Sequence, residues 1–77
     1  MIPPRVQWVF EKVLGADSDH LTPSTGQENL ERWDSMSHIE LVLALEMEFD
    51  VQFTTAEFSQ MTTIADILSL LREKGRL

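Results

Sequence analysis

The stretch WDSMSHIELVLALEMEFD, residues 33–50, decides the fold of this chain. Asp34 is a good helix N-cap, and the segment from Met36 to Phe49 contains neither glycine nor proline, so a long helix is predicted that ends before Asp50. At about 100° of rotation per residue, one sector of this helix is apolar and is expected to face a core. The residues of that core sector are Leu41, Val42, Leu45 and Phe49.

A first helix and a long connection are predicted before this stretch. Apolar residues recur at the spacing of one helical face after Pro4, which suits a first helical turn, and Gly15 stands where a helix commonly ends. A helix is therefore predicted over residues 4–14. From Gly15 to Trp33 no periodic pattern is sustained, and so long a connection in a small domain is more often functional or internally packed. The residues expected to anchor it to the core are Leu21, Leu30 and Trp33.

Two capping boxes predict the remaining helices. Thr54 is followed three residues later by Glu57, which predicts a short helix that runs to about Gln60. Thr63, with an aspartate three residues later, precedes an apolar helical face, and a helix is predicted over residues 64–74. No segment alternates as a strand would. The predicted fold class is all-α: a small four-helix bundle with a long loop between its first two helices and a short third helix.

Composition indicates one soluble globular domain over residues 1–77, with 43% hydrophobic and 25% charged residues. The absence of cysteine excludes disulfides, thiolate metal sites and a cysteine nucleophile, and two histidines are too few for most zinc sites, so no metal is predicted. Asp17-Ser18-Asp19-His20 is interpreted as a turn rather than a calcium loop. No membrane span or secretory signal is predicted, and a cytoplasmic monomer is expected.

The acidic residues are concentrated in the middle of the chain. The formal net charge is −7, which argues against binding to nucleic acid or anionic lipid. Neither lysine nor arginine occurs between Arg32 and Arg72. Such a field steers basic partners, although a merely solubilising surface is an equally simple interpretation. The acids in this interval are Asp34, Glu40, Glu46, Glu48, Asp50, Glu57 and Asp66.

The long helix carries a second apolar group outside its core sector. Its members are Met36, Ile39, Leu43 and Met47. Methionine suits surfaces that must fit several partners, and acids around an apolar strip would orient those partners. The second group therefore predicts a contact surface, with additional core burial as the alternative. His38 falls in the core sector and is expected to be a packing residue near the core edge.

Ser35 is the candidate functional residue. A hydroxyl at a helix N-terminus lies beside unpaired N–H groups and the positive end of the helix dipole, a favourable place for a phosphate, including a covalently attached one. From the residues alone, Asp34-Ser35 is first of all a helix cap. A triad of Ser35, His38 and Asp34 is rejected, because three residues of one turn do not readily take the required arrangement. No catalytic residue is therefore predicted, and the protein is not expected to be an enzyme.

The run from Trp33 to Asp50 resembles the Asp-Ser-Leu segment and acidic second helix of acyl carrier proteins. Thr62-Thr63-Ile64-Ala65-Asp66-Ile67 is similar to the start of that family's last helix, and length, helix order and acidity agree over nearly the whole chain. The resemblance implies that Ser35 carries 4′-phosphopantetheine, transferred from coenzyme A by a phosphopantetheinyl transferase. The terminal thiol of that arm would hold an acyl or aminoacyl group as a thioester. Asp34 would act as the adjacent cap and as a possible contact for the transferase.

The resemblance also implies partners and a docking surface. The expected partners are an acyl- or aminoacyl-loading ligase and downstream acyl-transfer enzymes of lipid or polyketide biosynthesis. Residues on the family's recognition helix are Met36, Ile39, Glu40, Leu43, Glu46, Met47 and Glu48. The family's frequent glycine and leucine around Asp-Ser are Arg32 and Met36 here, which suggests a specialised pathway. An unmodified acidic helical interaction module is the alternative function.

Overall fold

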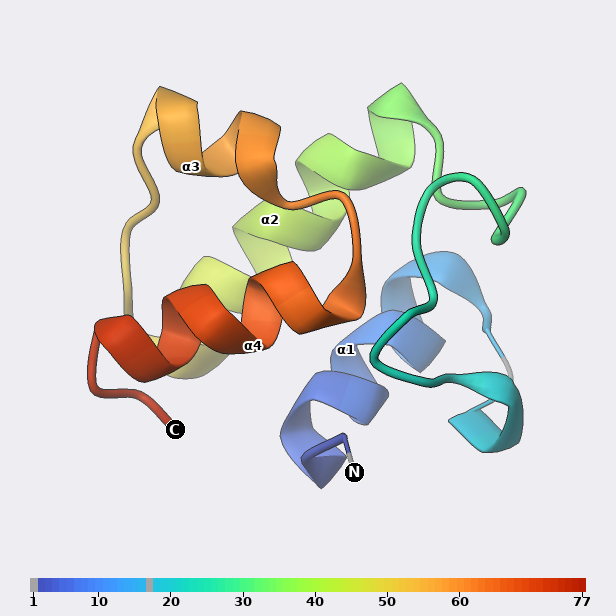
Figure 1. The fold of residues 1–77 in the computed structure, drawn as a ribbon, viewed down its shortest axis with the longest axis horizontal. Coiled ribbons are helices and arrows are strands. Elements are labelled where there is room, and N and C mark those ends of the chain that lie inside the picture. Colours follow the sequence, from blue (N-terminus) through green and yellow to red (C-terminus); the bar gives the residue numbers. More distant parts are fainter. Residues whose placement is uncertain (1, 17) are drawn as a thin grey trace.

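The computed structural model describes residues 2–16 and 18–77 and confirms the all-α fold. In these residues four α-helices gather around a shared interior, with the long connection at one side of the molecule (Figure 1). The elements in chain order are α1 (Pro4–Leu14), the 3-10 turn η1 (Ser18–His20), α2 (Ser35–Phe49), α3 (Thr55–Gln60) and α4 (Ile64–Glu73). In the described ranges, β pairing is limited to an isolated bridge between Gly26 and Thr63.

Helix α1 has the predicted bounds. Pro4 occupies its first turn, and Gly15 takes a left-handed conformation with φ 63° and donates its backbone N–H to the carbonyl of Glu11. The side chain of Arg32 lies across this end, and its Nη1 donates to the carbonyl of Leu14 at 3.4 Å. A cation is favourable at a helix C-terminus. Arg32, which stands where the resemblance leads us to expect glycine, therefore contacts the C-terminal end of α1.

Helix α2 is capped at both ends by aspartate. The carboxylate of Asp34 accepts from the backbone N–H of Ser37 at 2.9 Å, which confirms the predicted N-cap, and Ser35 is the first helical residue. At the other end Asp50 has a φ of 52° and donates its N–H to the carbonyl of Glu46. Aspartate tolerates this left-handed conformation better than most residues other than glycine.

Both predicted capping boxes are present. Thr54 Oγ1 accepts from the N–H of Glu57 at 3.1 Å, and the Glu57 carboxylate accepts from the N–H of Thr54 at 2.8 Å. Thr63 and Asp66 make the same reciprocal pair at 3.2 and 3.0 Å. Helix α4 ends at Glu73, just short of the predicted end. Local hydrogen bonding by side chains thus explains where α3 and α4 begin.

The core is built by α1, α2 and α4, whereas α3 contributes no fully buried side chain. Trp33 is 1% exposed and meets the ring of Phe10 edge to face, with 5.2 Å between the centroids. This confirms Trp33 as an anchor of the connection, and Leu21 and Leu30 are partly buried against the same core. The predicted core residues of α2 are all buried, namely Leu41, Val42, Leu45 and Phe49.

The long connection is internally packed and folds back on the start of α4. The N–H of Ile64 donates to the carbonyl of Thr25 at 2.9 Å, and the N–H of Ala65 donates to the carbonyl of Pro23 at 2.8 Å. The first N–H groups of a helix have no partner within it, so the connection satisfies two of them. Gly26 permits this close approach, because a Cβ there would lie 2.5 Å from the carbonyl oxygen of Thr62.

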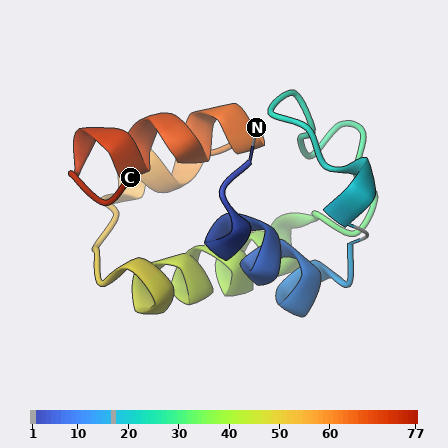
Figure 2. The same cartoon turned by 90° about the horizontal axis from the view of Figure 1, so that it is seen from below.

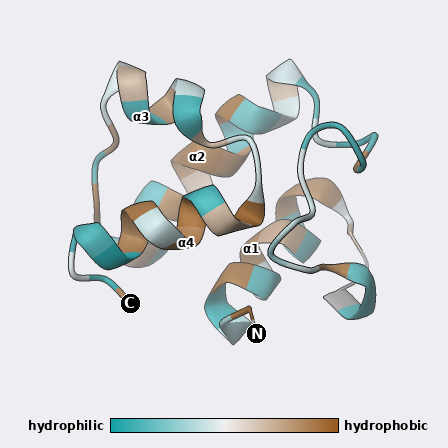
Figure 3. Cartoon of the chain, in the orientation of Figure 1, coloured by the Kyte–Doolittle hydropathy of each residue, from teal (hydrophilic) through white to brown (hydrophobic). Residues whose placement is uncertain are grey.

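The predicted turn at residues 17–20 is confirmed in part. Its last three residues form η1, whereas Asp17 lies outside the described residues. Figure 2 shows α1 in front of α2, with α4 on the other side of the interior. In Figure 3 the helices carry most of the hydrophobic residues, and the connection after η1 is mostly hydrophilic or neutral. Among the described residues, no helix combines the length and the apolar character needed to cross a bilayer.

Candidate functional site

Ser35 is exposed at the first position of α2. Backbone N–H groups of this first turn point out of the helix end, and the helix dipole adds a positive field. The chain is fixed immediately before the turn, since Trp33 is buried and Asp34 holds the cap. The Ser35 hydroxyl is therefore exposed to solvent beside a fixed segment of the chain, at a position that favours a phosphate.

Asp34 is a charged cap at the edge of this site. The backbone N–H of Ser37, and then its hydroxyl, hold the pKa of the Asp34 carboxyl below its usual value. A carboxylate that accepts such hydrogen bonds is favoured in its ionised form. The cap and the helix end therefore stabilise each other in neutral solution.

A groove with apolar walls leads away from Ser35 between α2 and α3. A cavity of about 360 Å³ is lined by Ser35, His38, Ile39 and Phe58, among others. A second cavity of about 350 Å³ continues along α2 and shares Ile39 and Phe58 with the first. We call these two adjoining cavities the α2–α3 groove. Its far half is lined mainly by apolar residues, among them Val42, Leu43 and Phe53.

His38 is a packing residue, as predicted. It is 5% exposed, and its Nδ1 accepts from the indole Nε1–H of Trp33 at 2.9 Å. Its Nε2 is 2.8 Å from the carbonyl oxygen of Phe58 and donates to it. Both ring nitrogens are therefore engaged, and neither is available to take a proton from Ser35. This geometry supports the rejection of a hydrolytic triad.

Nearly the whole sequence matches known proteins. A family model described as "Phosphopantetheine attachment site" matches residues 4–71. The chain is 31% identical over 75 residues to an acyl carrier protein of Bdellovibrio bacteriovorus, covering 97% of this chain and 96% of that protein. It is 32% identical over 74 residues to an acyl carrier protein of Cyanidioschyzon merolae, covering 95% of this chain and 81% of that protein. The chain belongs to the acyl carrier protein family.

The start of α2 fits the prosthetic group of this family, 4′-phosphopantetheine. The Ser35 hydroxyl is accessible, and a phosphodiester there would lie at the positive end of α2. The α2–α3 groove begins at the same serine and offers apolar walls of a kind that suits an alkyl chain. An acyl carrier protein needs no catalytic group of its own, because its function is to hold a reactive thiol and its cargo.

The second apolar group of the α2 helix lies outside the core of the carrier. Met36 is 76% exposed, Ile39 51%, Leu43 55% and Met47 84%. The alternative prediction, that these side chains are needed for core packing, is therefore wrong. Contiguous exposed apolar side chains are a typical feature of docking surfaces.

The three acids of the expected recognition helix differ in their internal contacts. Glu40 is exposed. Glu46 is half-buried, and its carboxylate accepts from the N–H of Phe53 at 2.9 Å, so it also fixes the chain between α2 and α3. Glu48 forms an ion pair with Arg5 at 2.9 Å. Of the three, Glu40 is the most open to a partner of the carrier.

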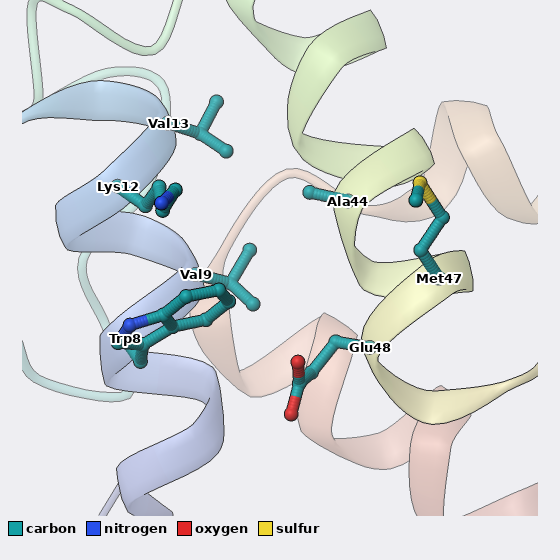
Figure 4. Close-up of a pocket in the computed structure, with 7 residues that line it drawn as sticks. All are labelled: Trp8, Val9, Lys12, Val13, Ala44, Met47 and Glu48. Carbon is teal, nitrogen blue, oxygen red and sulfur yellow. The ribbon is translucent and has the colours of Figure 1, made fainter.

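A groove between α1 and α2 was not predicted from the sequence (Figure 4). This cavity of about 430 Å³ has Val9, Val13 and Ala44 in its lining, with Trp8 and Met47 beside them. Trp8 is 50% exposed, and the Nζ of Lys12 lies 5.3 Å from its ring centroid. The sequence feature that could have indicated this groove is Trp8, a large aromatic residue that lies outside the apolar face of the helix predicted over residues 4–14. The carrier thus exposes apolar surface on both flanks of α2.

Proposed function

We propose that Ser35 carries the 4′-phosphopantetheine arm and that the carrier holds an acyl or aminoacyl group on it as a thioester for partner enzymes. The observation that carries this proposal is the exposed hydroxyl of Ser35 at the first turn of α2, at the mouth of the α2–α3 groove. When bound, the arm supplies a thiol that this cysteine-free chain lacks. A flexible tether would raise the effective concentration of the cargo at a partner's active site.

Attachment is a phosphoryl-transfer step catalysed by a phosphopantetheinyl transferase. The Ser35 oxygen would form a bond to the phosphorus that bears pantetheine, the pyrophosphate bond of coenzyme A would break, and adenosine 3′,5′-bisphosphate would leave. The proton of the hydroxyl passes to a base of the transferase, because His38 is fully engaged elsewhere. The carrier contributes position: Asp34 fixes the first turn and can contact the transferase.

Intact-mass spectrometry tests the attachment site. The protein is incubated with coenzyme A and a broad-specificity transferase, and the mass should rise by that of one arm. Ser35→Ala should abolish the increase, whereas Ser59→Ala, which removes another hydroxyl of the same cavity, should not. No increase with the unaltered chain would favour an unmodified acidic interaction module. An increase that survives Ser35→Ala would place the arm elsewhere.

We further propose that the carrier serves a specialised pathway and is loaded by an acyl- or aminoacyl-activating ligase. Support comes from the altered partner surface, where Met47 is 84% exposed within the acidic run and Arg32 replaces a frequent glycine. Efficient loading of the modified carrier by ordinary fatty-acid enzymes would contradict this proposal. A cytoplasmic monomer remains our expectation, and a net charge of −7 supports the monomeric state because like charges oppose self-association.

A further inference from the structure

His38 joins three parts of the molecule. Its backbone lies in the first turns of α2, its Nδ1 accepts from Trp33 at 2.9 Å, and its Nε2 donates to the carbonyl of Phe58 in α3 at 2.8 Å. An indole nitrogen can only donate and a carbonyl can only accept, so these contacts require a neutral imidazole with its proton on Nε2. Trp33 therefore determines the orientation in which His38 reaches α3.

Apart from the packing of Phe58 against the core, helix α3 has few other attachments. None of its residues, Thr55–Gln60, is fully buried, and six residues are too few for a helix to be stable alone. Its Glu57 forms an ion pair with Lys74 at 3.0 Å, beyond the end of α4. Between α2 and α3, the bond from His38 to Phe58 is the one direct hydrogen bond that the described residues make. The same two side chains also meet edge to face, with 4.5 Å between ring centroids.

Helix α3 supplies one wall of the α2–α3 groove. Phe58 lines both cavities of that groove, opposite Ile39 of α2, and the first cavity includes Ser35 and His38. A shift of α3 away from α2 would move Phe58 and open the groove at the end nearest Ser35. The side chain that fixes this distance is thus adjacent to the proposed attachment site.

We propose that His38 is a latch, a positioning residue that holds α3 against the first turns of α2 and thereby keeps Phe58 in the lining of the α2–α3 groove beside Ser35. The relevance of the groove to a bound arm rests on the proposed function, but the latch itself is a property of the unmodified chain. His38 is buried and touches neither the Ser35 hydroxyl nor a reacting atom. Its effect on the site passes through Phe58 and α3.

Two amide substitutions, each of which keeps an atom able to make one of the two bonds of the latch, separate those bonds. The amide nitrogen of glutamine lies as many bonds from Cα as Nε2 of histidine, so His38→Gln can still donate to the carbonyl of Phe58. The side-chain oxygen of asparagine lies as many bonds from Cα as Nδ1, so His38→Asn can still accept from Trp33. If His38 only filled space in the core, both variants would loosen the same parts of the structure.

Amide hydrogen exchange in the unmodified protein, followed by NMR, tests the latch. In His38→Asn the α3 amides should exchange about tenfold faster, while the indole N–H of Trp33 stays protected. In His38→Gln the opposite pattern is expected, with α3 protected and the indole N–H exposed. Ile67→Val serves as a control that lowers global stability from a core position in α4. Equal α3 exchange in the asparagine and glutamine variants, or an increase no greater than in the control, would overturn the proposal.

A second readout links the latch to the site. We measure kcat/KM for transfer of the arm from coenzyme A to Ser35. This value should fall more in His38→Asn than in either His38→Gln or Ile67→Val. If the unaltered chain accepts no arm, the proposed function fails, yet the exchange experiment still decides whether His38 is a latch. If the chain is modified and the variants exchange alike, the latch fails and the proposed function stands.

Discussion

Arg5 binds Glu48 and thereby ties the first turn of α1 to the last turn of α2. Its Nε lies 2.9 Å from the Glu48 carboxylate, its Nη2 donates to the backbone carbonyl of the same residue, and its guanidinium lies 4.5 Å from the ring centroid of Phe49. Glu48 was predicted as a partner contact, and this pairing gives it a structural function as well. The two functions can be separated by changing Arg5.

Arg5→Ala should lower the free energy of unfolding by about 1 kcal/mol, because an exposed ion pair, a side chain to carbonyl bond and a cation–π contact are lost together. Arg5→Lys should restore little of it, since an ammonium cannot bind two acceptors in this forked geometry. Urea denaturation measures both variants. Full stability in the alanine variant would show that α1 and α2 are held by apolar packing alone.

Met47→Glu should change partner binding while leaving stability within about 0.5 kcal/mol, because the side chain is 84% exposed on α2. The affinity for an authentic loading enzyme should fall about tenfold, as expected when an apolar contact becomes a charge. Leu45→Ala is the contrasting variant, since Leu45 is fully buried and its truncation should cost about 2–5 kcal/mol. A large drop in the melting temperature of Met47→Glu would assign that residue to the core.

The N-cap of α2 should make stability depend on pH in the acid range. The folded state holds the pKa of Asp34 below its usual value through hydrogen bonds from Ser37. A lowered folded pKa contributes stability that is complete above the unfolded pKa of about 3.9 and disappears as pH falls through the folded value. The stability difference between the unaltered chain and Asp34→Ala should therefore shrink as the pH falls below about 4. A difference that stays constant down to strongly acid pH would contradict this assignment.

Binding to enzymes that recognise α2 should weaken as salt is added, because the field of the acidic interval is screened within about 10 Å at 0.1 M salt. Glu40→Gln should reduce the association rate more than the dissociation rate, since a rim charge acts mainly on encounter. Association rates at several salt concentrations provide the measurement. Flat salt dependence would leave the apolar residues Met36, Leu43 and Met47 as the main determinants.

Helix bounds could be predicted because their causes are local. Asp34, Thr54 and Thr63 each accept from a backbone N–H three residues later, so the signal and the contact lie in one short window. The core sector of α2 followed from periodicity for the same reason. The exposure of Ser35 also follows from its place at a helix start.

Contacts between segments that are distant in the sequence leave no comparable pattern from which they could be predicted. The bond from His38 to Phe58 joins residues that no sequence period relates, and only the core location of His38 could be predicted. The α1–α2 groove depends on how closely Trp8 and Met47 approach after packing. The hydrogen bonds from α4 to the carbonyls of Pro23 and Thr25 use backbone atoms of the connection, and backbone contacts leave no pattern in the side chains.

That last arrangement bears on synthesis of the chain. Carbonyl groups of the connection that leads into Ser35 accept hydrogen bonds from the first two amides of α4, so the connection reaches its final conformation only after α4 has been translated and has emerged from the ribosome. We therefore expect a nascent chain without α4 to be a poor substrate for attachment of the arm. Attachment of the arm would then be confined to chains that already contain α4, and coenzyme A would not be consumed by translation products that stop before it.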